Sequence, residues 1–350
     1  MRYVFSLAAL VSLWFACSPA HAQTEKPLIP LQLDGDPQPV QIPARAMLYS
    51  PQCDGSGAIY VRYSPVDDDN HPAKLVRVET DGTTKGIPPV SLPNPAGDTH
   101  VFLFAAGNDD SLHEIMRVPI ENDSGEADND IRYVTFDKDG SLNSQSTFED
   151  DFIPSTLVPL PSGDFFAAGV VLNPMGEGLT EGPIAGIFGS DGRLKRRLQN
   201  TESGLVNVTD EPSNPSDNSN DLSLEGAVIR LGGDGNLYVL LPGDTVRVEV
   251  VSQAGHVLRQ MELEQPFANS MAEDMLLSGN RLVVVYEGEA GGAATLPVYV
   301  LYDAQSGEII RQYQPEFSGT VACFEDGQTL TLLMRQPSSG AMAIAQAELQ

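Results

Sequence analysis

The sequence predicts an all-β fold, a six-bladed β-propeller of four-stranded antiparallel blades. The first observation is the stretch 224–264, in which four short runs rich in Val and Leu are separated by turns of Gly, Asp and Pro. Runs of this kind form strands joined by tight hairpins, and four in succession make one propeller blade. The second observation is that such turns recur about every 50 residues, a spacing typical of blades. The third is that no window has a competing helical periodicity.

Residues 1–22 have the pattern of a cleaved signal peptide. Arg2 supplies a positive charge, residues 4–16 form an apolar run, and a small-x-small motif precedes Gln23. The apolar run is short for a membrane span. We therefore expect a secreted or periplasmic protein. An uncleaved anchor and a lipid anchor at Cys17 are the alternatives.

Residues 23–350 are expected to form a single propeller domain. Turns between the first and second strands of successive blades are expected near Gly57, Asp109, Gly163, Gly235, Gly279 and Gly327. One interval is longer because it contains residues 201–221, which are rich in Ser, Asn, Asp and Pro and poor in large apolar side chains. Such a segment cannot bury enough apolar surface to order itself, so we expect a flexible polar loop between the third and fourth blades.

The two ends of the chain are expected to close the ring together. Residues 320–350 offer three strands before the chain ends, one fewer than a blade needs. Residues 23–43 contain two short extended runs around Asp34, similar to an outer hairpin detached from its blade. We predict that this segment completes the last blade, because such closure leaves no long unpaired sheet edge.

Cys53 and Cys323 occupy equivalent positions in the first and last blades, each four residues before the turn glycine. A closed ring makes these blades neighbours, so a disulfide could join them and restrict the unfolded chain strongly. Equivalent positions on adjacent inner strands are expected to splay apart, however, and bridged Cα atoms are seldom more than about 7 Å apart. Two buried thiols are the alternative, and the sequence leaves both open.

The composition restricts the class of partner. The chain carries 48 acidic and 20 basic residues, a net charge of −28. So acidic a protein repels phosphate backbones and anionic membrane surfaces, so we expect no nucleic-acid partner. We also expect no membrane span after signal removal. An unknown protein partner or a small cationic ligand is compatible with this charge, and we expect a monomer.

No catalytic motif is present, whereas the acidic residues follow a pattern. In a propeller the loops after the second and fourth strands emerge on one face, and the tight turns emerge on the other. We predict one acidic rim on the loop face, formed by the acidic residues within 67–69, 121–130 and 149–151. It would bind a cation or a basic partner. The alternative is that these charges are only solvated loop residues.

Hydrophobic–Asp-Gly–hydrophobic hairpins cover nearly all of residues 23–350, and in this the chain resembles the six-bladed β-propeller superfamily of NHL-repeat and gluconolactonase-like proteins. The resemblance implies a fold and no single activity. Gluconolactonase-like propellers hold a divalent cation at the channel mouth with carboxylate and amide groups. By position alone, the resemblance implies a calcium site with three candidate metal ligands near the starts of innermost strands: Asp151, Glu225 and Asn269.

The leading hypothesis from the sequence is an exported, non-catalytic propeller scaffold that binds a partner or ligand through its acidic loop face, with no cofactor. The alternative is a calcium-dependent, lactonase-like hydrolase with carboxylates at the mouth of the central channel. The identity of the ligand is not encoded in any motif.

Overall fold

The computed structural model describes most of the chain after residue 26. The described residues are 27–54, 56–65, 73–87, 99–107, 109–121, 127–137, 140–148, 152–172, 180–201, 204–208, 224, 226–243, 245–267, 270–290, 293–294, 297–336 and 339–350. Within them the regular structure is all β. The part of the chain that the structure describes contains no helix that could span a membrane.

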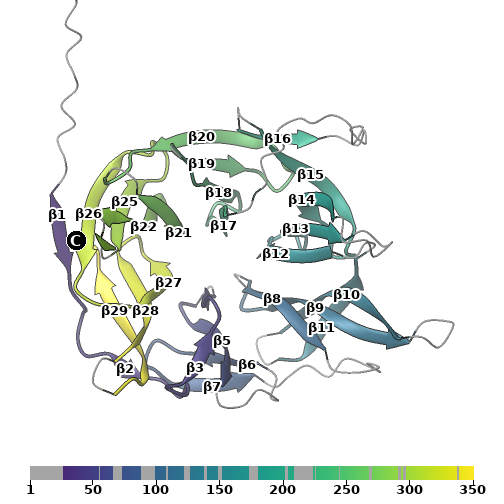
Figure 1. Ribbon diagram of the computed structural model, residues 1–350, viewed down its shortest axis with the longest axis horizontal. Helices are drawn as coiled ribbons and strands as arrows, with labels where there is room; N and C mark the ends of the chain where they lie inside the picture. The colour runs from purple at the N-terminus through teal and green to yellow at the C-terminus, as the bar shows by residue number, and fades with distance from the viewer. Residues whose placement is uncertain are drawn as a thin grey trace, which may run out of the picture.

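Six antiparallel sheets stand around a central axis, which confirms the six-bladed propeller (Figure 1). The first three blades, each from its innermost strand outward, are β3 (Ala46–Leu48) with β4 (Gln52–Cys53), β5 (Ile59–Pro65), β6 (Lys74–Val78) and β7 (Thr84–Ile87); β8 (His100–Ala106), β9 (Leu112–Glu121), β10 (Ala127–Phe136) and β11 (Leu142–Thr147); and β12 (Phe152–Pro159), β13 (Phe165–Leu172), β14 (Thr180–Phe188), β15 (Leu194–Thr201) and β16 (Gly204–Val208).

The last three blades complete the ring. They are β17 (Val228–Leu231), β18 (Leu237–Leu241), β19 (Val246–Val251) and β20 (Val257–Leu263); β21 (Met271–Ser278), β22 (Arg281–Glu287), β25 (Val298–Asp303), β26 (Ile309–Pro315) and β1 (Leu28–Leu31); and β27 (Thr320–Glu325), β28 (Thr329–Arg335), β29 (Met342–Glu348) and β2 (Gln38–Pro39). A two-stranded hairpin, β23 (Glu289–Ala290) with β24 (Ala293–Ala294), lies between β22 and β25 in the chain. The six predicted inner turns each fall between the first and second strands of a blade, as expected.

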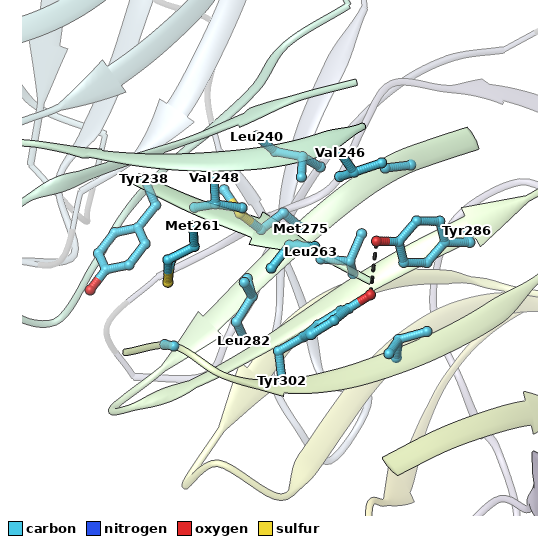
Figure 2. Packing of buried hydrophobic residues seen from close by; sticks show 14 of the residues in the cluster. Tyr238, Leu240, Val246, Val248, Met261, Leu263, Met275, Leu282, Tyr286 and Tyr302 are labelled. Carbon is cyan, nitrogen blue, oxygen red and sulfur yellow. Dashed lines mark hydrogen bonds between the residues drawn. The ribbon is translucent and has the colours of Figure 1, made fainter. Parts of the chain in front are cut away.

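The core lies between the faces of neighbouring blades. Side chains alternate along each strand, so each sheet offers one apolar face to the blade before it and one to the blade after it. Figure 2 shows the cluster between the fourth and fifth blades, where Val248 and Met275 are fully buried. Within it the Tyr286 and Tyr302 hydroxyls hydrogen-bond at 2.9 Å, and Tyr302 donates to the Glu264 carbonyl at 2.6 Å. The buried tyrosines therefore stabilise the seam without leaving an unpaired hydroxyl.

The N-terminal segment closes the ring, as predicted. β2 pairs antiparallel with β29, with Gln38 opposite Ile344 and Pro39 opposite Ala343. The expectation of a detached hairpin is wrong, because β1 pairs in parallel with β26 of the fifth blade instead. The segment thus covers the outer edges of two blades in succession. Both strands contain a proline, which an edge strand tolerates because one side of its backbone has no partner strand.

Cys53 and Cys323 form a disulfide, with their Cα atoms 5.3 Å apart. The expectation that these positions splay apart is wrong, since the innermost strand of the first blade is interrupted after Leu48. Its continuation β4 has only two residues and lies against β27 of the last blade. The bridge therefore joins the two blades at which the ring closes, on their innermost strands.

Candidate functional site

The innermost strands of all six blades enclose a cavity of ≈ 380 Å³ on the propeller axis. Its lining consists of residues 51–54, 105–106, 157–159, 229–231, 276–277 and 321–326. These residues are the last ones of each innermost strand, so the cavity lies at the end of the channel next to the tight inner turns. It is therefore at the opposite end from the loop face on which the acidic rim was predicted.

Asp54 closes one side of the cavity and is already neutralised. Its side chain is fully buried, and Arg77 donates to its Oδ2 from Nε at 3.1 Å and from Nη2 at 3.0 Å. The Oδ1 atom accepts the Ser56 amide at 2.8 Å and the Ala58 amide at 3.0 Å. Asp54 thus shapes the turn after β4 and adds little net charge to the cavity.

Glu325 and Asp326 form an acidic wall beside Asp54, at the end of β27. Glu325 is half-buried and Asp326 is exposed. Burial raises the pKa of the Glu325 carboxyl, and the charges of Asp326 and Asp54 raise it further. The turn of the first blade fits closely around this wall, because a side chain at Gly57 would collide with the Glu325 carboxylate. The neighbouring carboxylates repel one another, so a cation in the cavity would relieve the repulsion.

Arg230 provides a positive charge on β17. Its Nη2 donates to Asp274 Oδ1 on β21 at 2.7 Å, and the two side chains keep 36% and 29% of their surfaces exposed. The innermost strands contact one another in the ring order β4, β8, β12, β17, β21 and β27. β17 is therefore across the axis from β4, and Figure 1 shows it on the far side of the central space from the first blade.

The cavity lining is polar but offers little for covalent catalysis. The residues that line it include no Ser, Thr, Tyr, His or Lys within the described chain, and its two cysteines are joined in the disulfide. Backbone groups, aliphatic side chains, the Phe324 ring, the Gln52 amide, the carboxylates and one guanidinium make up the remaining surface. Such a set can orient a small polar molecule through charge and hydrogen bonds.

A second cavity of ≈ 370 Å³ lies in the seam between the third and fourth blades. It is lined by residues 153–156, 168–170, Ile184, Ala185, Leu224, Gly226 and Ala227. The lining contains no charged side chain, and Ser155 uses its hydroxyl to bind the Ala168 carbonyl at 3.2 Å. This seam therefore has fewer groups with which to recognise a ligand than the axial cavity.

A partly buried chain of polar side chains, which the sequence did not predict, lies at the inner turn of the second blade. The Ser111 hydroxyl lies 2.7 Å from His113 Nε2, and Tyr133 Oη lies 2.6 Å from His113 Nδ1. Ser111 donates in turn to the Asp109 carboxylate. Burial lowers the pKa of His113 to about 4, against the opposing charge of Asp109. The imidazole is therefore neutral at pH 7.

This chain closes a turn and is not a nucleophile–base pair. The Ser111 proton is committed to Asp109, so the hydroxyl is not activated by the imidazole. The fourth blade has the same arrangement, in which Asp234 accepts hydrogen bonds from Asn236 and from Tyr238 Oη at 3.2 Å. The shared pattern Gly-x-Asp-x-(Ser/Asn)-Leu-(His/Tyr) at residues 107–113 and 232–238 is the sequence signal that could have found it.

Glu114 and Arg62 are buried between the first and second blades. Arg62 Nη1 donates to the Val101 carbonyl at 3.1 Å, and the guanidinium lies over the Tyr49 ring. Burial raises the pKa of Glu114 to about 7, and the charge of Arg62 offsets only part of this effect. The Glu114 carboxyl is therefore poised to exchange its proton near neutral pH.

The three residues predicted as metal ligands, Asp151, Glu225 and Asn269, lie outside the described residues. The structure therefore does not test them. Most of the predicted acidic rim is also outside, although Glu121, Asp128 and Asp130 are described, on the paired strands β9 and β10. Within the described chain no three His, Cys, Asp or Glu side chains are arranged to hold a metal ion. Calcium binding stays a prediction.

No family model matches the sequence, and no curated protein matches it. Among solved structures the chain is similar to a luciferin-regenerating enzyme, with 10% identity and a TM-score of 0.43 over 89% of this chain and 95% of that one. It is similar to regucalcin, a calcium-binding protein of Agrobacterium tumefaciens, with 10% identity and a TM-score of 0.41 over 92% of this chain and 97% of that one. It is also similar to an acylaminoacyl peptidase of Pyrococcus horikoshii, with 10% identity and a TM-score of 0.45 over 90% of this chain and 54% of that one. These likenesses concern the propeller fold and identify no specific family.

Proposed function

We propose that this protein is a non-catalytic propeller whose central cavity binds a small polar molecule. The observation that carries the proposal is the cavity itself, since all six innermost strands contribute to its wall. Its volume of ≈ 380 Å³ lies at the lower end of the range for ligand pockets, about 300–1,000 Å³. The charged groups at its wall, and the lack of a hydroxyl, imidazole or amine among its described lining residues, favour binding over covalent catalysis.

Export and the acidic loop face remain part of the proposal. A signal peptide at residues 1–22 would place the propeller in an oxidising compartment, in which a bond between Cys53 and Cys323 persists. The acidic rim would then carry a second function, the attraction of a basic protein partner to the other face. Its main segments lie outside the described residues, whereas described residues line the cavity.

The experiment is a screen of small polar molecules by ligand-observed NMR, repeated on a variant with a filled cavity. Ala106 lines the cavity and is half-buried beside the apolar cluster of the first two blades, so Ala106→Trp adds a large ring at the cavity wall. The matched control is Gln305→Trp, at an exposed turn of the fifth blade. Molecules that bind the wild type should bind the control and lose binding to Ala106→Trp, whose folding is checked by thermal melting. Undiminished binding to a folded Ala106→Trp would refute the proposal, as would a screen without any binder.

A further inference from the structure

We infer that the central cavity selects a zwitterion, a small molecule with an ammonium group at one end and a carboxylate at the other, such as a linear amino acid. The inference rests on the proposed function and specifies its ligand. Its basis is that the cavity is lined by two free carboxylates at the end of β27 and by a guanidinium on β17, and that these strands are separated by one strand around the ring. A molecule with a single charge could satisfy only the carboxylates or only the guanidinium.

The acidic wall is the site for the ammonium group. Of the three carboxylates at this side, Asp54 is held by two hydrogen bonds from Arg77, which leaves Glu325 and Asp326 with net negative charge. No ion pair joins either of them to a cationic side chain among the described residues. An ammonium group has three donors and can contact both carboxylates, together with the carbonyl groups at the ends of the innermost strands.

The Arg230 guanidinium is the site for the carboxylate group. A guanidinium has five N–H donors in a planar fork, and the pair with Asp274 uses one Nη2 donor. A second contact, from Nη1 to the Ile229 carbonyl, is long at 3.4 Å. Donors therefore remain for a ligand carboxylate, while Asp274 keeps the guanidinium in place. Because the ion pair is partly exposed, its rearrangement on binding costs little.

The position of the two walls adds a requirement on length. Arg230 is on the fourth blade, whereas Glu325 is on the sixth, with the fifth blade between them around the ring. The ligand must extend through the cavity to reach both walls. Affinity should therefore depend on the number of carbon atoms between the two charged groups and pass through a maximum.

Isothermal titration calorimetry with a series of probes tests this. The probes are glycine, β-alanine, 4-aminobutyrate, 5-aminopentanoate and 6-aminohexanoate, with butylamine and butyrate as the analogues that carry one charge. At least one amino acid should bind. Each analogue with a single charge should bind at least about tenfold more weakly than this amino acid, because it lacks the charge-assisted hydrogen bonds at one end. Equal affinity for butylamine would mean that the cavity recognises only a cation, and equal affinity for butyrate only an anion. Either result overturns the inference.

Two variants test which wall of the cavity binds the ammonium group of the ligand and which binds its carboxylate. Glu325→Gln should weaken the amino acid about tenfold and leave butyrate unchanged, whereas Arg230→Gln should weaken the amino acid and leave butylamine unchanged. The controls are Glu348→Gln and Arg196→Gln, both at exposed positions on outer strands. Loss of both analogues in either variant would indicate general damage to the cavity and contradict the assignment. If no probe binds while other molecules bind and are lost in Ala106→Trp, the inference fails and the proposed function stands. If no binding depends on Ala106, both fail.

Discussion

Replacement of Cys53 and Cys323 by Ala in one chain should lower the free energy of unfolding by several kcal/mol. The disulfide closes a loop of 270 residues in the unfolded chain, which loop-entropy arithmetic converts to about 5–6 kcal/mol at 25 °C. This is an upper figure, because measured losses are about 2–5 kcal/mol. The folded ring keeps its other closing contact, the pairing of β2 with β29, so we expect the variant to fold.

Urea unfolding without reductant measures this loss. The matched control is a reductant, which should destabilise the wild type and leave the double variant unchanged. Thiol titration of the denatured chain without residues 1–22 provides the decisive check, because only these two cysteines remain in it. Two free thiols per chain, or equal unfolding midpoints for wild type and variant, would refute the reasoning.

Three further predictions follow from the described contacts. The folded pKa of Glu114, about 7, exceeds its ordinary 4.5, so the folded chain holds a proton that the unfolded chain releases, and stability should fall by about 3 kcal/mol as pH rises through this window. Urea unfolding from pH 4 to 8 should show this fall in the wild type and lose it in Glu114→Gln; an unchanged pH profile in the variant would contradict the assignment. His113→Ala should cost about 2–4 kcal/mol, because it leaves the Tyr133 hydroxyl without its imidazole partner and opens a gap beside Ser111, whereas the exposed control His256→Ala should cost almost nothing in the same assay. Removal of divalent metals with EDTA should leave cavity binding measured by calorimetry unchanged, since the recognising charges belong to protein side chains; loss of binding that calcium restores would favour the calcium-dependent alternative.

The architecture was predictable because its signals are local. A turn that needs a positive φ selects glycine, as at Gly57 with φ 82° and Gly235 with φ 77°, so the turns could be counted from the sequence. The missing last strand followed from the same count. The parallel pairing of β1 with β26 did not, because it depends on which sheet edge the N-terminal segment reaches after folding.

The candidate site was harder to predict from the sequence than the architecture. Arg230 and Asp274 are 44 residues apart and meet only because their blades are neighbours, so neither stood out in the chain. The Cys53–Cys323 bridge depended on the short strand β4, which the pattern of apolar residues does not indicate. The acidic residues of the sequence gather in the long loops and so indicate the loop face, whereas the axial cavity lies beside the tight turns.

The most direct test of the central claim is a crystal structure of the protein with the tightest-binding amino acid of the probe series. We expect electron density for one molecule on the propeller axis, with its carboxylate at Arg230 and its ammonium group at Glu325. Density in the seam between the third and fourth blades, or on the loop face with an empty axial cavity, would contradict it.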